Sequence, residues 1–187
     1  MQYTPSPIAG AWILDITPIP DARGFFAMTW LPDELRQRGM NSSLAQCNLA
    51  FNHKRGTLRG MHFQTDPGQA KLVRCARGQI LDVVVDLRRD SDTFGRWDGH
   101  ELDDANLRQL WVPVGFAHGF CVLSEEADVV YKCSSYYDPA TEAGIAYDDP
   151  DVGIAWPDLE LLVSERDRSA PRLADVAESL TFLNEKA

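Results

Sequence analysis

Residues 71–88 read KLVRCARGQILDVVVDLR, and this stretch decides the class of fold. It is rich in valine and isoleucine, and its second half shows alternation of apolar and polar side chains. Such a pattern is typical of strands that pack one face against a core. The Arg77-Gly78 pair in the middle marks a turn. We therefore expect two strands joined at Arg77-Gly78.

Similar short segments lie on both sides of this stretch. RQLWVPVGFAHGFCVLS (residues 108–124) and ADVVYKCSSYY (residues 127–137) follow it at similar spacing. AWILDITPIP (residues 11–20) predicts an early strand ended by prolines, and DARGFFAMTW (residues 21–30) a turn followed by an aromatic strand. Many short strands, separated by glycine and proline every 8–12 residues or so, indicate a β-sandwich or barrel.

Helical signals are few. A short helix is predicted with Asp33 as its N-cap and Gly39 as its stop. Residues 164–183 change to a helical pattern with a start rich in Ser and Asp. We expect a single all-β domain, with a β barrel over about 20–150 and a C-terminal helical cap over about 151–187.

Composition excludes several classes of function. The chain has 187 residues, of which 44% are apolar, enough for one domain with a core. Its net charge of −10 gives no basic surface for nucleic acid or for an anionic membrane. No run of eighteen apolar residues and no signal-peptide pattern is present, so neither a membrane partner nor secretion is expected.

The four cysteines point to a reducing compartment. Cys47, Cys75, Cys121 and Cys133 form no CxxC pair, and their spacing fits neither a zinc site nor a disulfide framework. Reduced thiols are the default in the cytosol, so we expect a cytoplasmic protein.

RGTLRGMHFQ (residues 55–64) holds the first candidate site residues. Arg59 and His62 are three residues apart, so a regular strand would place them on opposite faces. Gly60 lies between them, and a glycine inside a strand often marks a bulge. We expect a bulge at Gly60 that turns both side chains into one cavity.

Two spacings resemble the motifs of cupins, which are double-stranded β-helix jelly rolls. They are Gly56-x5-His62-x-Gln64 and Pro113-x-Gly115-x2-His118. In metal-binding cupins the first motif supplies two histidines and a glutamate. Here Gln64 replaces the second histidine, and no carboxylate stands at the glutamate's place. Two imidazoles make a poor metal site, so we expect a cupin-type jelly roll without a metal.

A more specific resemblance covers most of residues 21–172. The chain resembles the dTDP-4-dehydrorhamnose 3,5-epimerase family, cofactor-free cupins that act on sugar nucleotides. The matching stretches are DARGFF, QCN, GTLRGMHFQ, QAKLVRCARGQILDVVVDLR, DTFGRW, QLWVPVGFAHGF, VVYKCSSYYDPATEAGI, DDPDVGIAWP and LVSERDRSAP.

The resemblance implies roles for particular residues. His62 would be the base, held by Asp167, and Tyr131 the acid on the opposite face of the sugar. Lys71 would complete the catalytic set, and Arg59 with Lys71 would hold the diphosphate and the C4 carbonyl region. The other implied binding residues are Arg23, Phe26, Met28, Gln46, Asn48, His118, Tyr137, Glu142 and Arg166.

The chemistry explains these residue types. Epimerisation beside a ketone removes a proton from carbon and returns one from the other face, and the keto group itself takes up the electrons. No cofactor is therefore needed. Histidine suits the base, a carboxylate fixes its tautomer, and tyrosine suits the acid where a neighbouring cation lowers its pKa. Lys71 and Tyr131 are candidates to stabilise the enolate.

The alternation of side chains along a strand adds an expectation about the nucleotide. On a regular strand, Tyr131 and Tyr137 would face the same side about 20 Å apart, the span from a hexose to a stacked base. Either Tyr137 or its neighbour Tyr136 would stack on the base. Met28 stands where the family usually has a glutamate that contacts the base.

Several alternatives remain open at this point. A mono-epimerase would act at C3 or C5 only, on a dTDP-, CDP- or GDP-linked sugar. A metal-dependent oxygenase and a non-catalytic sugar-nucleotide sensor belong to other classes. The resemblance also implies a homodimer with shared active sites, paired through FFAMTW (residues 25–30), which is too apolar to remain an exposed edge.

Overall fold

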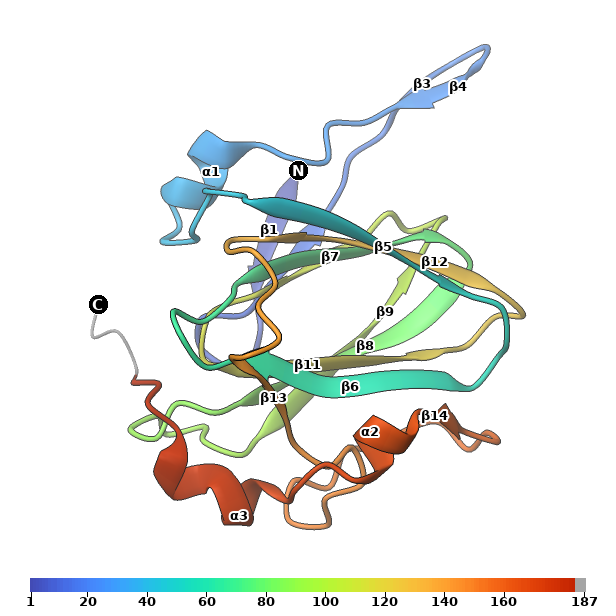
Figure 1. The fold of residues 1–187 in the computed structure, drawn as a ribbon. Coiled ribbons are helices and arrows are strands. Elements are labelled where there is room, and N and C mark those ends of the chain that lie inside the picture. Colours follow the sequence, from blue (N-terminus) through green and yellow to red (C-terminus); the bar gives the residue numbers. More distant parts are fainter. Residues whose placement is uncertain (184–187) are drawn as a thin grey trace.

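Two antiparallel sheets face each other in the computed structural model, which describes residues 1–183 (Figure 1). This arrangement confirms the expected all-β jelly roll. The first sheet contains β1 (Gln2–Pro5), β2 (Trp12–Asp15), β10 (Gln109–Val112), β7 (Lys71–Arg77), β12 (Ala127–Cys133) and β5 (Gln46–Asn52), in that spatial order.

The second sheet contains β13 (Glu142–Gly144), β6 (Thr57–Gln64), β11 (Phe116–Val122), β8 (Gln79–Asp86) and β9 (Trp97–Asp103), with β14 (Leu162–Val163) parallel to β6. The predicted turn at Arg77-Gly78 joins β7 to β8. The two strands belong to different sheets, however, and do not pair with each other. The turn therefore carries the chain from one layer to the other.

The main core lies between the sheets. Val73, Leu110 and Val129 from the first sheet pack with Ile80 and Phe120 from the second. Because β1 and β2 are hydrogen-bonded into the first sheet, the barrel begins at Gln2 and not near residue 20 as predicted.

The C-terminal cap covers the outer face of the second sheet (Figure 1). It contains α2 (Glu165–Arg168), α3 (Leu173–Val176) and the 3-10 turn η1 (Ala177–Ser179). Leu173, Leu180 and Phe182 pack on Val83 and Val85 of β8. Three short helical elements therefore follow the barrel, and α2 lies beside β6. Residues 184–187 of the predicted cap lie outside the described part of the chain.

The early helix differs in its start from the prediction. It is α1 (Pro32–Arg36), its N-cap is Leu31, and Asp33 lies inside its first turn. Pro32, which has no N–H to leave unpaired, starts the helix two residues earlier than an N-cap at Asp33 predicts. Gly39 has a φ of 75° just after the helix, which agrees with its predicted role as a stop.

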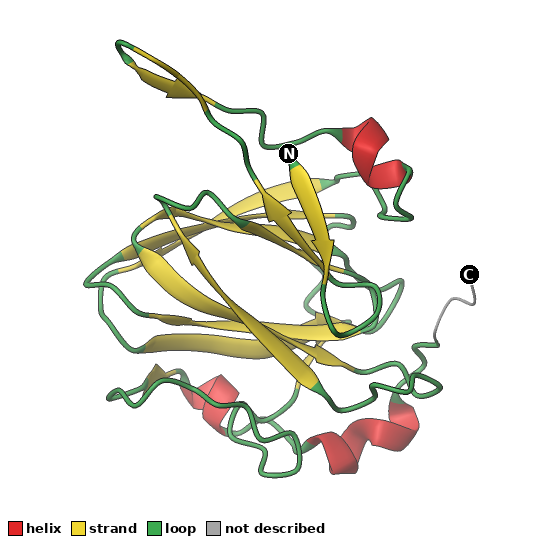
Figure 2. Ribbon diagram, turned by 180° about the vertical axis from the view of Figure 1, so that it is seen from behind, coloured by secondary structure: helices red, strands yellow, loops and turns green. Residues whose placement is uncertain are grey.

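A two-stranded hairpin projects away from the barrel (Figures 1 and 2). It consists of β3 (Ile19–Asp21) and β4 (Gly24–Phe26), so the predicted aromatic strand ends at Phe26. Phe26 is 65% exposed, whereas Trp30 packs against the chain's own core. No helix within residues 1–183 is long and apolar enough to span a membrane.

Candidate active site

A bulge in β6 brings two candidate residues to one side. The pairing of β6 with β11 shifts by one residue between Arg59 and His62, as predicted. Gly60 has a φ of 124°, and a Cβ atom on it would lie 2.6 Å from the Gly119 Cα. Only glycine fits so close an approach in this left-handed conformation. As a result, both Arg59 and His62 line the same cleft.

Two adjoining cavities of about 510 and 490 Å³ form the candidate site. They share His62, Lys71 and Tyr131. All but three of the residues implied by the resemblance line one cavity or both. The first cavity adds Arg59, His118, Arg166 and Asp167, and the second adds Gln46, Asn48, Tyr137 and Glu142.

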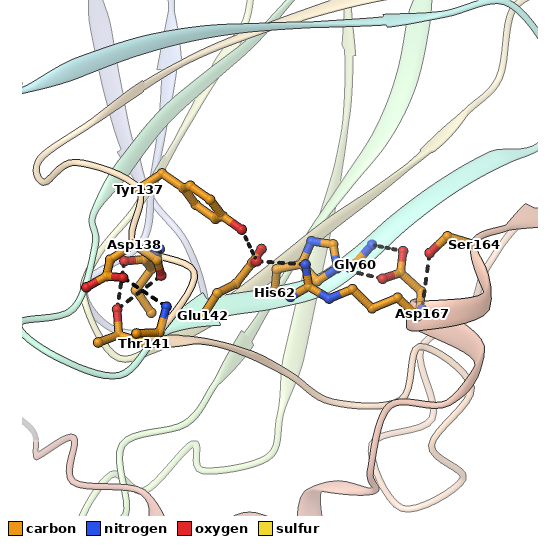
Figure 3. Close-up of polar contacts among 11 residues, drawn as sticks. Gly60, His62, Tyr137, Asp138, Thr141, Glu142, Ser164 and Asp167 are labelled. Carbon is orange, nitrogen blue, oxygen red and sulfur yellow. Dashed lines mark hydrogen bonds and ion pairs between the residues drawn. The ribbon is translucent and has the colours of Figure 1, made fainter.

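His62 and Asp167 form a dyad (Figure 3). The His62 Nε2 lies 2.7 Å from the Asp167 Oδ1, and the Gly60 N–H donates to the other carboxylate oxygen. Burial alone would raise the pKa of Asp167, but the hydrogen bond and charge of His62 hold that pKa below its usual value. With Nε2 turned to the carboxylate, Nδ1 is the nitrogen left to act as a base.

Helix α2 positions the carboxylate of this dyad. Ser164 is its N-cap, and its side-chain oxygen accepts a hydrogen bond from the Asp167 N–H. The serine therefore does the capping, and the Asp167 side chain is free to bind His62. The Asp167 side chain is only 5% exposed, so its carboxylate acts in a largely dry setting.

Tyr131 reaches the site from the opposite sheet. It lies on β12, whereas His62 lies on β6, and both border the two cavities. Burial, reinforced by Cys133 and Glu142, raises the pKa of Tyr131, although Arg59 and Asn48 act to lower it. The expected cation is present, but burial outweighs it. The phenol accordingly keeps its proton and is able to donate it.

Lys71 and His118 lie deep between the sheets. Burial lowers the pKa of Lys71, opposed by the charges of Cys133, Asp82 and Glu142. The His118 Nε2 lies 2.8 Å from the Asp82 Oδ1, and both side chains are buried. Sequence reasoning missed Asp82. An acidic residue inside the apolar run of β8 was the signal that pointed to it.

Tyr137 is held from two sides at the second cavity. Its backbone N–H donates to the Gln46 Oε1 at 2.9 Å, and its hydroxyl donates to the Glu142 Oε2 at 2.6 Å. Arg166 donates to the same carboxylate oxygen at 2.7 Å. Tyr136 is 73% exposed and borders neither cavity, so Tyr137 is the better candidate to stack on a base.

The predicted strand from Tyr131 to Tyr137 is wrong. Strand β12 ends at Cys133, and Tyr137 lies in the loop that follows. Its position is set by the hydrogen bonds to Gln46 and Glu142 and not by the alternation of side chains along a strand.

Gln64 occupies the position of the second histidine of metal-binding cupins. Its amide nitrogen donates to the Asp138 carbonyl at 3.2 Å, and its amide oxygen accepts from the Thr141 hydroxyl at 3.1 Å. It therefore holds the loop that leads from Tyr137 to Glu142. Within the described residues, no group of three or more His, Cys, Asp or Glu side chains is placed to hold a metal ion.

Arg23, Phe26 and Met28 lie on or next to the projecting hairpin and line neither cavity. Arg23 forms an ion pair with Asp21 of the same hairpin, and Met28 is 50% exposed. A single chain therefore does not bring these residues to its own site.

Comparisons with known proteins agree with this geometry. The family model for dTDP-4-dehydrorhamnose 3,5-epimerase matches residues 5–175. A curated relative of that name from Methanothermobacter thermautotrophicus is 44% identical over 172 residues, which cover 90% of this chain and 92% of the relative.

Solved structures give the same result. The dTDP-6-deoxy-D-glucose-3,5-epimerase of Legionella pneumophila, in complex with dTDP-4-keto-L-rhamnose, matches with a TM-score of 0.94 and 36% identity over 99% of both chains. ChmJ, a 3'-monoepimerase from Streptomyces bikiniensis in complex with dTDP-quinovose, matches with a TM-score of 0.88 and 42% identity, covering 94% of this chain and 89% of that one. The sequence, the jelly roll and these similarities together show that the chain belongs to the dTDP-4-dehydrorhamnose 3,5-epimerase family.

Proposed function

We propose that this protein epimerises a nucleoside-diphosphate 4-keto-6-deoxyhexose at C3, C5 or both, without a cofactor. The reaction is of the type that converts dTDP-4-dehydro-6-deoxy-D-glucose to dTDP-4-dehydro-L-rhamnose. One observation carries the proposal. A base held by a carboxylate, His62 with Asp167, and a protonated phenol, Tyr131, come from opposite sheets and border the same cavities.

The roles follow from the geometry. His62 takes the proton from the carbon beside the ketone through Nδ1, and Asp167 stabilises the imidazolium that forms. Lys71 is the buried hydrogen-bond donor available to the enolate oxygen, and a preorganised donor of this kind is typically worth about 3–4 kcal/mol. Tyr131 then donates its proton to the opposite face of the carbon, which inverts the configuration.

The second cavity suits the nucleotide. Tyr137 presents a ring held by two hydrogen bonds, and Gln46, Asn48 and Glu142 add polar groups around it. The relatives solved with dTDP-sugars support dTDP as the carrier.

The direct test is NMR of the 4-keto-6-deoxy sugar nucleotide incubated with the protein in D2O. Deuterium at both C3 and C5 supports a 3,5-epimerase. Deuterium at C3 alone or at C5 alone supports a mono-epimerase, and the similarity to ChmJ favours C3 in that case. Binding without any exchange would support a non-catalytic sensor. Loss of activity on treatment with a chelator would support a metal-dependent cupin.

We also propose that the working unit is a homodimer with shared active sites. The hairpin leaves Phe25 and Phe26 exposed, and Arg23 and Met28 lie next to them, away from their own cavities. A second copy would cover the two aromatic rings and receive Arg23 and Met28 at its nucleotide site.

The four free cysteines support a reducing, cytoplasmic location.

A further inference from the structure

Asn52, at the end of β5, is a buried amide at the edge of the first cavity. It is 1% exposed, yet it lines the cavity together with Arg59 and Tyr131. The resemblance to the family gave Asn52 no role. A buried polar side chain at a candidate site requires an account of its hydrogen bonds.

All the hydrogen-bonding groups of this amide have partners. The Asn52 nitrogen donates to the carbonyl of Ala50 at 2.9 Å and to the carbonyl of Ala127 at 3.1 Å. Its oxygen accepts from the Arg59 Nε at 2.8 Å. Since both amide hydrogens go to backbone carbonyls, the oxygen has one direction available, toward Arg59.

This contact fixes the guanidinium in a particular way. The Arg59 Nε is occupied by Asn52, so the two terminal nitrogens are the groups left for a ligand. The acceptor is a neutral oxygen, so it orients Arg59 without cancelling its charge. A carboxylate at the same place would orient the guanidinium but neutralise it.

The charge of Arg59 acts on the candidate acid. Arg59 favours ionisation of Tyr131, whereas burial of the ring opposes it. Displacement of the guanidinium would leave burial unopposed by this cation and would make the phenol a poorer proton donor.

We propose that Asn52 is a positioning residue that holds Arg59 beside Tyr131 and thereby assists proton donation to the sugar. This inference rests on the proposed epimerase function. After His62 has taken the proton, the enolate has two fates. It recovers a proton from His62 with retained configuration, or it receives the Tyr131 proton and inverts. Asn52 shifts this balance toward inversion.

The test compares the two fates in one sample. Asn52→Ala is incubated with the sugar nucleotide in D2O, and deuterium exchange and inversion are both followed by NMR. We expect the ratio of inversion to exchange to fall by about tenfold, the lower end for losing a hydrogen bond to a charged group. The total rate of exchange should change much less, because His62 and Asp167 remain in place.

A pH profile of inversion distinguishes an effect on the position of Arg59 from a loss of packing. Tyr131 must be protonated to act as the acid, so its ionisation sets the basic limb of inversion. Without the cation nearby, this limb should move to higher pH in Asn52→Ala. Asn52→Asp, which preserves size and adds a negative charge beside Arg59, should move it in the same direction. A loss of packing alone would lower the rate without moving the limb.

Gln109→Ala is the matched control. Gln109 is also a buried amide of the first sheet that donates to a backbone carbonyl, but it borders neither cavity. Gln109→Ala should leave both the ratio of inversion to exchange and the basic limb unchanged.

If wild-type protein shows no exchange, the epimerase proposal and this inference both fall. If wild type epimerises and both Asn52 variants keep its ratio and its basic limb, the inference alone is overturned.

Discussion

The cavities and the projecting hairpin are built in opposite ways. Around the cavities, His62, Tyr131 and Lys71 lie between two sheets and are held by neighbours from β strands, α2 and the loop after β12. The hairpin has an ion pair between Arg23 and Asp21 and exposes Phe26 to solvent. The difference shows that one chain is enough to bring the proposed catalytic residues, His62 and Tyr131, together. The implied contacts of the hairpin to the nucleotide base require a second chain. Substitutions in the two regions should therefore fail differently.

His62→Asn should have the largest effect. It removes the only base proposed for the reaction, and general base catalysis typically contributes about 100- to 10,000-fold. Deuterium exchange should be lost at every carbon that exchanges in wild type, while the protein stays folded and still binds dTDP. Exchange at the wild-type rate in a folded variant would remove His62 from the mechanism.

Tyr131→Phe should separate deuterium exchange from inversion of configuration. The ring and its packing remain, but the proton donor is gone. We expect exchange with retained configuration, because His62 still removes and returns protons on its own face. The measurement is deuterium content against product configuration in the same NMR sample. Inversion at the wild-type rate would require a different acid.

Phe26→Asp on the hairpin should spare the chemistry and weaken assembly. A charge at the centre of the proposed contact between copies disfavours burial of Phe25 and its neighbours. Light scattering should show a shift from twice 20.9 kDa toward 20.9 kDa, and KM should rise more than kcat falls. A wild-type protein that is already monomeric would contradict the shared site.

Met28→Glu should have the smallest effect. Glutamate accepts a hydrogen bond from a thymine ring N–H, whereas methionine offers only packing. We expect the ratio of kcat/KM for dTDP over CDP sugars to rise by a few fold, about the value of one hydrogen bond near a surface. An unchanged ratio in a dimeric protein would show that Met28 does not contact the base.

The sequence predicted the parts of the molecule that depend on local chemistry. The strands around Gly78, the bulge at Gly60 and the helical cap follow from glycine placement and apolar patterning. It failed at Asp33, because Pro32 starts α1, and at Tyr137, because β12 ends four residues earlier. Both errors concern the ends of elements. The start of α1 is decided locally by Pro32, whereas hydrogen bonds to Gln46 and Glu142 hold Tyr137 beyond the end of β12.

The missed residues share one physical reason. Asn52 and Asp82 act through partners that are distant in sequence or on another strand, Arg59 and His118. The apolar run around Asp82 signals a buried carboxylate, but neighbouring residues do not identify the partner of either side chain. Eleven of the residues implied by the resemblance line the cavities. The resemblance could identify them because it reflects a known three-dimensional site, whereas the pattern of apolar and polar residues reflects only local structure.

The junction of the two cavities has a consequence for inhibitor design. Because His62, Lys71 and Tyr131 border both cavities, these three residues are accessible to a fragment from either side. A compound therefore does not need a diphosphate to reach them. Two weak fragments, one on each side, would meet at these residues, and a short linker would let the second bind at a high effective concentration.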